Sequence, residues 1–78
     1  MKVGVKILPR KEVLDSSGRT VTKTLQGNNF KVSDCRVGKY LELDVTASTP
    51  EEAKEQVQKM AEFVLYNPLT ENYTLEVL

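Results

Sequence analysis

This chain of 78 residues has no histidine, no tryptophan and a single cysteine, Cys35, which has no second thiol to pair with. Histidine is the usual general base near neutral pH and the commonest ligand of transition metals. Without it a Cys–His nucleophilic pair cannot be built, and one cysteine cannot complete an ordinary structural zinc site. Carboxylate-only Mg²⁺ chemistry remains open, but we do not expect an enzyme complete within this chain.

The net charge is zero, because eleven basic and eleven acidic residues cancel. That balance argues against a nucleic-acid or anionic-membrane partner, and no apolar run is long enough to span a bilayer. The first residues, MKVGVKILPRKEV, lack the apolar region of a signal peptide. We therefore expect a cytoplasmic protein with one domain over residues 1–78, and its small size favours association with itself or a partner.

Alternating apolar residues predict four strands, and capping signals predict two helices. The predicted strands are residues 2–8, 30–37, 40–45 and 73–78. The first helix follows the capping oxygens of DSSG at 15–18 and stops at Gly27. Apolar positions change parity at Ser33-Asp34, which predicts a bulge or bend within the second strand.

The second helix carries the clearest signals. Thr49 is predicted at the N-cap and Pro50 at the first helical position, and Glu52 completes a capping box three residues after the cap. Asn67-Pro68 is predicted to end the helix. One apolar stripe follows at helical spacing: Ala53, Val57, Met60, Ala61, Val64 and Leu65.

The order β-α-β-β-α-β predicts an α+β fold, a two-layer ferredoxin-like sandwich. Its four-stranded antiparallel sheet would carry both helices on one face. In the usual strand order, 4-1-3-2, the first strand is central. Its outward lysines, Lys2 and Lys6, would then face acidic residues of neighbouring strands. These acidic residues are Glu42, Asp44 and Glu76.

Gly38-Lys39 is the pair that ends a phosphate-binding loop, but the rest of that motif is missing. Such a loop needs a glycine five residues earlier and Ser or Thr after the lysine, and this chain has Ser33 and Tyr40 there. We interpret Gly38 as a turn or bulge into a strand. An RNA-recognition surface would need several aromatic residues on the central strands, where only Tyr40 is available.

Four segments resemble, in order and spacing, the PurS family, the small subunit of bacterial and archaeal phosphoribosylformylglycinamidine synthase. They are VLDSSG at 13–18, VGKYLEL at 37–43, NPLTENY at 67–73 and LEV at 75–77. Two positions depart from the family's pattern. Ser16 stands where a proline is usual, and Thr70 stands where an apolar residue usually precedes Glu71. Neither change removes a charged motif residue.

The resemblance implies a role in de novo purine biosynthesis. In this family a PurQ-type glutaminase subunit releases ammonia, and a PurL-type synthetase subunit uses ATP, with Mg²⁺, to amidate formylglycinamide ribonucleotide. The small subunit, a dimer or a tetramer, bridges these two partners and supports ammonia transfer. It would have no catalytic residue and bind no cofactor or metal of its own.

The motifs that carry the resemblance also supply candidates for subunit interfaces. They are Asp15, Gly18, Arg36, Gly38, Lys39, Glu42, Asn67, Pro68, Glu71 and Tyr73. Among these, Arg36, Lys39 and Glu42 are charges that the fold does not obviously require, so they are the best docking candidates.

A hypothesis from a different class is an ACT-like regulatory domain, which shares the same order of strands and helices. Such domains bind an amino acid at a dimer interface, often beside a glycine-containing first loop, and here that loop contains Gly18 and several hydroxyls. Stabilisation of the fold by a free amino acid would favour this alternative.

Overall fold

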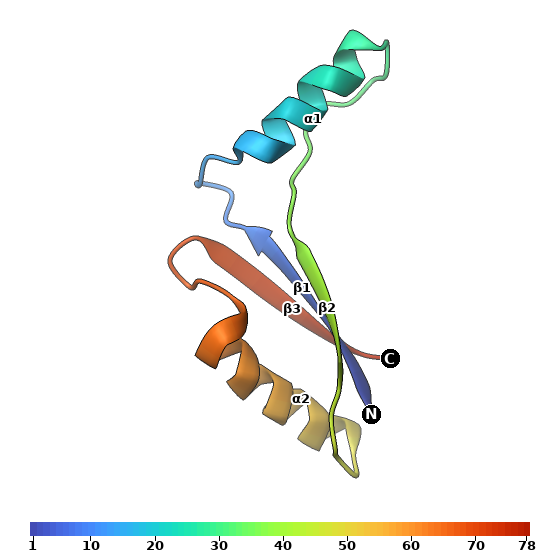
Figure 1. The fold of residues 1–78 in the computed structure, drawn as a ribbon, viewed down its shortest axis with the longest axis vertical. Helices are drawn as coiled ribbons and strands as arrows, with labels where there is room; N and C mark the ends of the chain where they lie inside the picture. Colours follow the sequence, from blue (N-terminus) through green and yellow to red (C-terminus); the bar gives the residue numbers. More distant parts are fainter.

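Six elements follow one another in the computed structural model, which describes residues 1–78 (Figure 1). They are β1 (Lys2–Pro9), α1 (Ser16–Gly27), β2 (Lys39–Asp44), α2 (Pro50–Met60), the π-helical segment η1 (Ala61–Leu65) and β3 (Glu71–Val77). Two main helices and an antiparallel sheet confirm the predicted α+β class. None of the helices combines the length and apolar character needed to cross a membrane.

β1 is the central strand of a three-stranded antiparallel sheet with the order β2-β1-β3. These strands lie in the order that the sequence predicts for them. The register places Leu41 and Leu75 beside Val5, one on each side, so apolar side chains of all three strands share one face. Val3, Val5 and Ile7 are fully buried on that face, which places the core over β1.

α2 packs over β1 and β3 and buries Ala53 and Val57 completely. As predicted, the backbone N–H of Glu52 donates to the Thr49 hydroxyl oxygen, at 3.2 Å. The Glu52 carboxylate reaches back one residue further than in a standard capping box and accepts from the Ser48 hydroxyl, at 2.9 Å. That hydroxyl, with the Ser48 backbone N–H, lowers the pKa of Glu52, so the start of α2 is firmly capped.

The prediction that one apolar stripe continues along the whole second helix is wrong near the C-terminal end of that helix. α2 ends at Met60, and the next five residues form η1. A π-helical turn holds more residues than an α-turn, so the side chains that follow face a different direction. Ala61 is fully buried as predicted and Leu65 packs against the core, but Val64 is 73% exposed.

α1 stands away from the sheet at one end of an elongated molecule (Figure 1). The radius of gyration is 15.6 Å, whereas a compact chain of this length would have about 11.5 Å. The prediction that two helices cover one face of the sheet is therefore wrong for the single chain, where only α2 does so. We call residues 15–37 the arm, and the sheet with α2 and η1 the body.

Residues 30–37 form no strand, so the predicted fourth strand is missing and the sheet has three. The segment runs as an extended connection with a bend at Ser33, at the predicted change of parity. The backbone N–H groups of residues 31–36 donate no hydrogen bond within the chain. An extended segment becomes a strand only when a neighbour pairs with it, and no strand runs beside this one.

Candidate functional site

The structure gathers most of the predicted interface residues into two groups. The first, which we call the joint, lies where the arm meets the body and contains Asp15, Gly18, Arg36 and Gly38. The second, which we call the turn, lies between η1 and β3 and contains Asn67, Pro68, Glu71 and Tyr73. Lys39 reaches the turn from β2, and Glu42 lies apart from both groups.

Asp15 ties the two ends of the arm together. One carboxylate oxygen accepts from the Gly18 backbone N–H at 2.9 Å and so caps α1. The other accepts from the Val37 backbone N–H, also at 2.9 Å, 22 residues further along the chain. These two hydrogen bonds, and the nearby charge of Arg36, lower the pKa of Asp15. The side chain thus works as an ionised clamp at neutral pH.

Two glycines allow close backbone contacts at the joint. A Cβ atom on Gly18 would collide with the Cys35 carbonyl oxygen, and one on Gly38 would collide with the Ile7 carbonyl oxygen. Both contacts are too short for any side chain. Gly18 therefore lets the returning chain lie against the first turn of α1, and Gly38 lets it lie against β1 as it enters β2.

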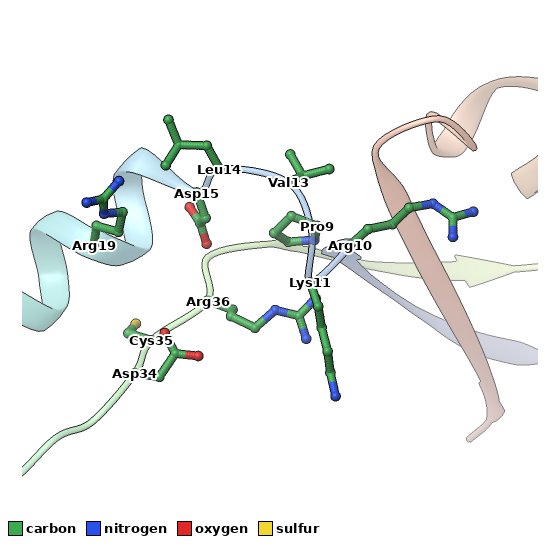
Figure 2. Close-up of a pocket in the computed structure, with 10 residues that line it drawn as sticks. All are labelled: Pro9, Arg10, Lys11, Val13, Leu14, Asp15, Arg19, Asp34, Cys35 and Arg36. Carbon is green, nitrogen blue, oxygen red and sulfur yellow. The ribbon is translucent and has the colours of Figure 1, made fainter.

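Arg36 lines a pocket of about 490 Å³ between the arm and the body (Figure 2). In this view the Arg36 side chain extends toward Lys11, while Arg10 points away toward the turn. Arg36 also lines a smaller pocket, of about 210 Å³, with Lys6 and Thr74. It is half-buried and forms no ion pair within the chain, although its charge also acts on nearby Asp15.

The turn is held by hydrogen bonds to its backbone. The Asn67 N–H donates to the Glu71 carboxylate at 2.8 Å, and the Leu69 N–H donates to the Asn67 side chain at 3.0 Å. Lys39 lies 3.9 Å from Glu71 across the sheet. Asn67 and Glu71 therefore hold the turn that connects η1 to β3, and Lys39 adds a weak, exposed ion pair.

Tyr73 lies near the start of β3 and packs against the core. Its ring meets the Tyr66 ring edge-on, with centroids 4.6 Å apart and planes at 61°, a favourable aromatic geometry. Burial is the largest cause that raises the pKa of Tyr73, followed by the charge of Glu62. The phenol thus stays protonated at neutral pH, and the residue serves mainly to pack.

Glu42 lies on the open face of the sheet, where it pairs with Lys2 at 3.6 Å. This is the cross-strand attraction that the sequence predicts for Lys2. The other predicted partner, Lys6, faces Tyr40 and Thr74 in the register and forms no ion pair. The open face is therefore only partly self-complementary in charge.

Arg10 is a structural residue that the sequence analysis missed. Its guanidinium donates twice to the Pro68 carbonyl oxygen, at 2.8 and 3.1 Å, across a separation of 58 residues. No local pattern marks such a contact, because its acceptor is a backbone atom that only the fold brings near. Exposed apolar side chains at Phe63 and Leu69, 86% and 83% exposed, also lie around the turn. They were not predicted either.

The joint and the turn together are well suited to holding the arm and the start of β3 in fixed positions. Their hydrogen bonds fix the direction of the arm and the connection into β3, and they use backbone groups as partners rather than a second reactive side chain. Half-buried Arg36 and the exposed side chains of Phe63 and Leu69 then remain beside these rigid points. Such an arrangement favours docking to other chains over chemistry on a small substrate.

Comparison with known proteins gives consistent matches. The family model described as PurS: Phosphoribosylformylglycinamidine (FGAM) synthase matches residues 2–78. The PurS subunit of phosphoribosylformylglycinamidine synthase from Synechocystis is 38% identical over 87% of this chain and 69% of its own length.

Two solved structures from Thermotoga maritima extend this likeness to the fold. The purS subunit of phosphoribosylformylglycinamidine synthase has a TM-score of 0.93 at 33% identity, with 99% of this chain and 90% of that chain covered. A chain in the structure of PurLQS has a TM-score of 0.91 at 33% identity, with 99% and 95% covered. The elongated shape, with the arm away from the sheet, therefore closely matches experimental structures of relatives.

Proposed function

This chain belongs to the PurS family of phosphoribosylformylglycinamidine synthase subunits, and from that premise we propose that it is the noncatalytic assembly subunit. It would bridge a PurL-type synthetase and a PurQ-type glutaminase and support the passage of ammonia between them. The family match over residues 2–78 carries this proposal, and it favours assembly over the ACT-like alternative.

The likeness to a chain of PurLQS supports the choice of partners. The chemistry of the reaction would lie in these partners. The glutaminase would release ammonia from glutamine, and the synthetase would hold ATP and Mg²⁺ and amidate formylglycinamide ribonucleotide. This chain would hold neither cofactor, and its work would be to bring the two subunits together in the cytoplasm.

Self-association is part of the same proposal. The chain exposes 5771 Å², while a compact monomer of 8.8 kDa would expose about 4,800 Å². Large apolar side chains remain at the surface of both the arm and the body, among them Leu14, Phe30 and Phe63, each at least 60% exposed. Such surface favours a dimer or a larger assembly.

Arg36 is the strongest docking candidate among the three predicted charges. Lys39 and Glu42 each already have a partner within the chain, whereas Arg36 lines both pockets without one. A free guanidinium at a rigid surface suits a carboxylate of a partner subunit.

Reconstitution tests the function directly. Synthetase and glutaminase are assayed with glutamine as the nitrogen donor, with and without this chain, and then with ammonium salt as the donor. We expect the chain to raise the glutamine-dependent rate and leave the ammonia-dependent rate unchanged. An unchanged glutamine-dependent rate contradicts the proposal.

A further inference from the structure

Basic side chains gather around the larger of the two pockets, where the arm meets the body. Five of the eleven basic residues of the chain line this pocket or the smaller one, and none of the five forms an ion pair. They are Lys6, Arg10, Lys11, Arg19 and Arg36. Positive charge is thus concentrated at the joint, although the net charge of the whole chain is zero.

The two carboxylates that line the larger pocket do not neutralise these cations. Asp15 accepts hydrogen bonds from the Gly18 and Val37 backbone N–H groups, at 2.9 Å each, so each of its oxygens already has a donor. The charge of Arg36 is the smallest of the causes that act on the pKa of Asp15. Asp34 is exposed and forms no ion pair. Four basic and two acidic residues line the larger pocket, which leaves it with a formal charge of +2.

Two of the cations in the larger pocket lie on backbone that is held in position. Figure 2 shows the Arg36 side chain extending toward Lys11. Lys11 belongs to a turn in which the Val13 N–H donates to the Arg10 carbonyl oxygen at 3.0 Å. The hydrogen bond that the Val37 N–H donates fixes the residue after Arg36. Cations that are positioned before a ligand arrives lose little conformational freedom on binding, which favours an anion between them.

The size and lining of the larger pocket favour an ester of phosphate over a bare inorganic anion. Its volume of about 490 Å³ lies in the range of small-molecule sites, about 300–1,000 Å³. Pro9, Val13 and Leu14 supply an apolar lining that an organic group can contact. A phosphate monoester has a charge of about −1.5 to −2 at neutral pH, which balances the formal charge of the lining. Its oxygens also suit the donor geometry of a guanidinium.

We propose that the larger pocket binds a phosphate monoester of a small organic molecule. Arg36 and Lys11 hold the phosphate oxygens, and Pro9 and Val13 lie against the organic group. The assembly function does not depend on this site. Because Arg36 is also the strongest docking candidate, a bound phosphate and a partner's carboxylate exclude one another at that side chain.

Phenyl phosphate is the probe for this site, because it combines a phosphate dianion with an apolar ring. The isotope-labelled full chain is titrated with phenyl phosphate, inorganic phosphate and phenol at constant ionic strength and about pH 7.5, and amide chemical shifts are followed. We expect saturable shifts at residues 10–14 and 34–37, with phenyl phosphate binding at least about threefold more tightly than inorganic phosphate. Shifts that do not saturate overturn the site. An affinity for phenol or inorganic phosphate equal to that for phenyl phosphate overturns the assignment to an ester.

Matched variants connect the binding to this pocket. Arg36→Gln should raise the Kd of phenyl phosphate at least about tenfold, because it removes charge-assisted hydrogen bonds. Lys11→Gln, at an exposed position, should raise it about three- to tenfold. Lys54→Gln on α2, outside both pockets, should leave it within about twofold. Equal increases in all three variants would reveal a general effect of charge and overturn the site.

Two further measurements keep this inference separate from stability and from docking. Unchanged amide shifts in β1 and β3 show that each variant is folded, and Lys11→Gln tests the site even where Arg36→Gln disturbs the joint. Binding of each variant to the partner subunits is measured separately. If Arg36→Gln weakens that binding but leaves the affinity for phenyl phosphate unchanged, Arg36 serves docking alone and the proposed ligand site is overturned.

Discussion

The body is stabilised by different interactions from those that stabilise the arm. Every fully buried apolar side chain belongs to the body, including Ile7, Val3 and Val57, and the arm contributes only Gly18 to the buried residues. The arm relies on helix caps, the Asp15 clamp and hydrogen bonds from Gln26 and Asn28 to nearby carbonyls. The body should therefore respond to changes in core volume, and the arm to the loss of hydrogen bonds or of a partner surface.

The largest effect is expected in the body core. Ile7→Ala should destabilise the fold by about 2–5 kcal/mol, because it removes buried methylene groups and leaves a cavity. Urea unfolding followed by circular dichroism measures this loss. The matched arm substitution, Val21→Ala in the monomeric state, should cost less than about 1 kcal/mol. Equal losses would contradict the division between body and arm.

The next effect is expected at the joint. Gly38→Ala should destabilise the chain by about 1–3 kcal/mol, because the new Cβ would collide with the Ile7 carbonyl oxygen and the backbone must shift. Gly27→Ala is the control, since a Cβ there meets nothing within 4 Å. Thermal unfolding of both variants measures the difference. Two equal changes would show that the contact with β1 does not constrain Gly38.

Asp15→Ala should loosen the arm and leave the body folded, because α1 loses its cap and Val37 loses its acceptor. Hydrogen exchange, read amide by amide, measures this as faster exchange in α1 with unchanged rates in β1. Asp34→Ala, an exposed carboxylate in the same arm, is the matched control. Faster exchange in the body as well would mean that the clamp supports the whole fold.

The same clamp predicts a dependence on pH. Because the folded-state pKa of Asp15 is lowered, its contribution to stability is complete above the unfolded carboxyl's pKa of about 4. It is lost as the pH falls through the folded-state pKa. Exchange of the α1 amides, corrected for the intrinsic rate, should thus be constant from about pH 7 to 5 and rise below about pH 4. A steady rise from neutral pH would contradict this assignment.

The smallest effect on stability is expected at the surface charges. Lys39→Glu and Arg36→Glu should change the free energy of unfolding by less than about 1 kcal/mol, because the first removes an exposed ion pair and the second removes none. We expect both to weaken binding to the partner subunits more than they lower the melting temperature. Lys54→Glu on α2 is the control. If it weakens binding equally, net charge rather than position is responsible.

Local signals explain which predictions were confirmed. Asp15 and Thr49 cap the two helices, and three of the four predicted strands form in the predicted order. Capping and alternation act between residues close in the chain, so they can be recognised without knowing the fold. The π-helical turn that exposes Val64 has no comparable local signal in the sequence.

The interface role of Asp15, Gly18 and Gly38 stays a prediction. Within the chain, the structure also uses these residues to clamp and direct the arm. Arg10 was missed altogether, because its acceptor at Pro68 is distant in the chain. The motifs could therefore select these positions, while their contacts became visible only once separate segments were brought together.

The amino-acid sequence by itself determined the α+β class, the caps, the apolar face of the sheet and the PurS likeness, because these depend on residue type and short spacing. Only the tertiary structure decided where the arm lies. Residues 30–37 have the alternation of a strand, but a strand needs a neighbour to pair with its backbone. Whether the chain turns back at Gly38 or runs straight past it depends on close contacts with Ile7 and Asp15, which no local pattern contains.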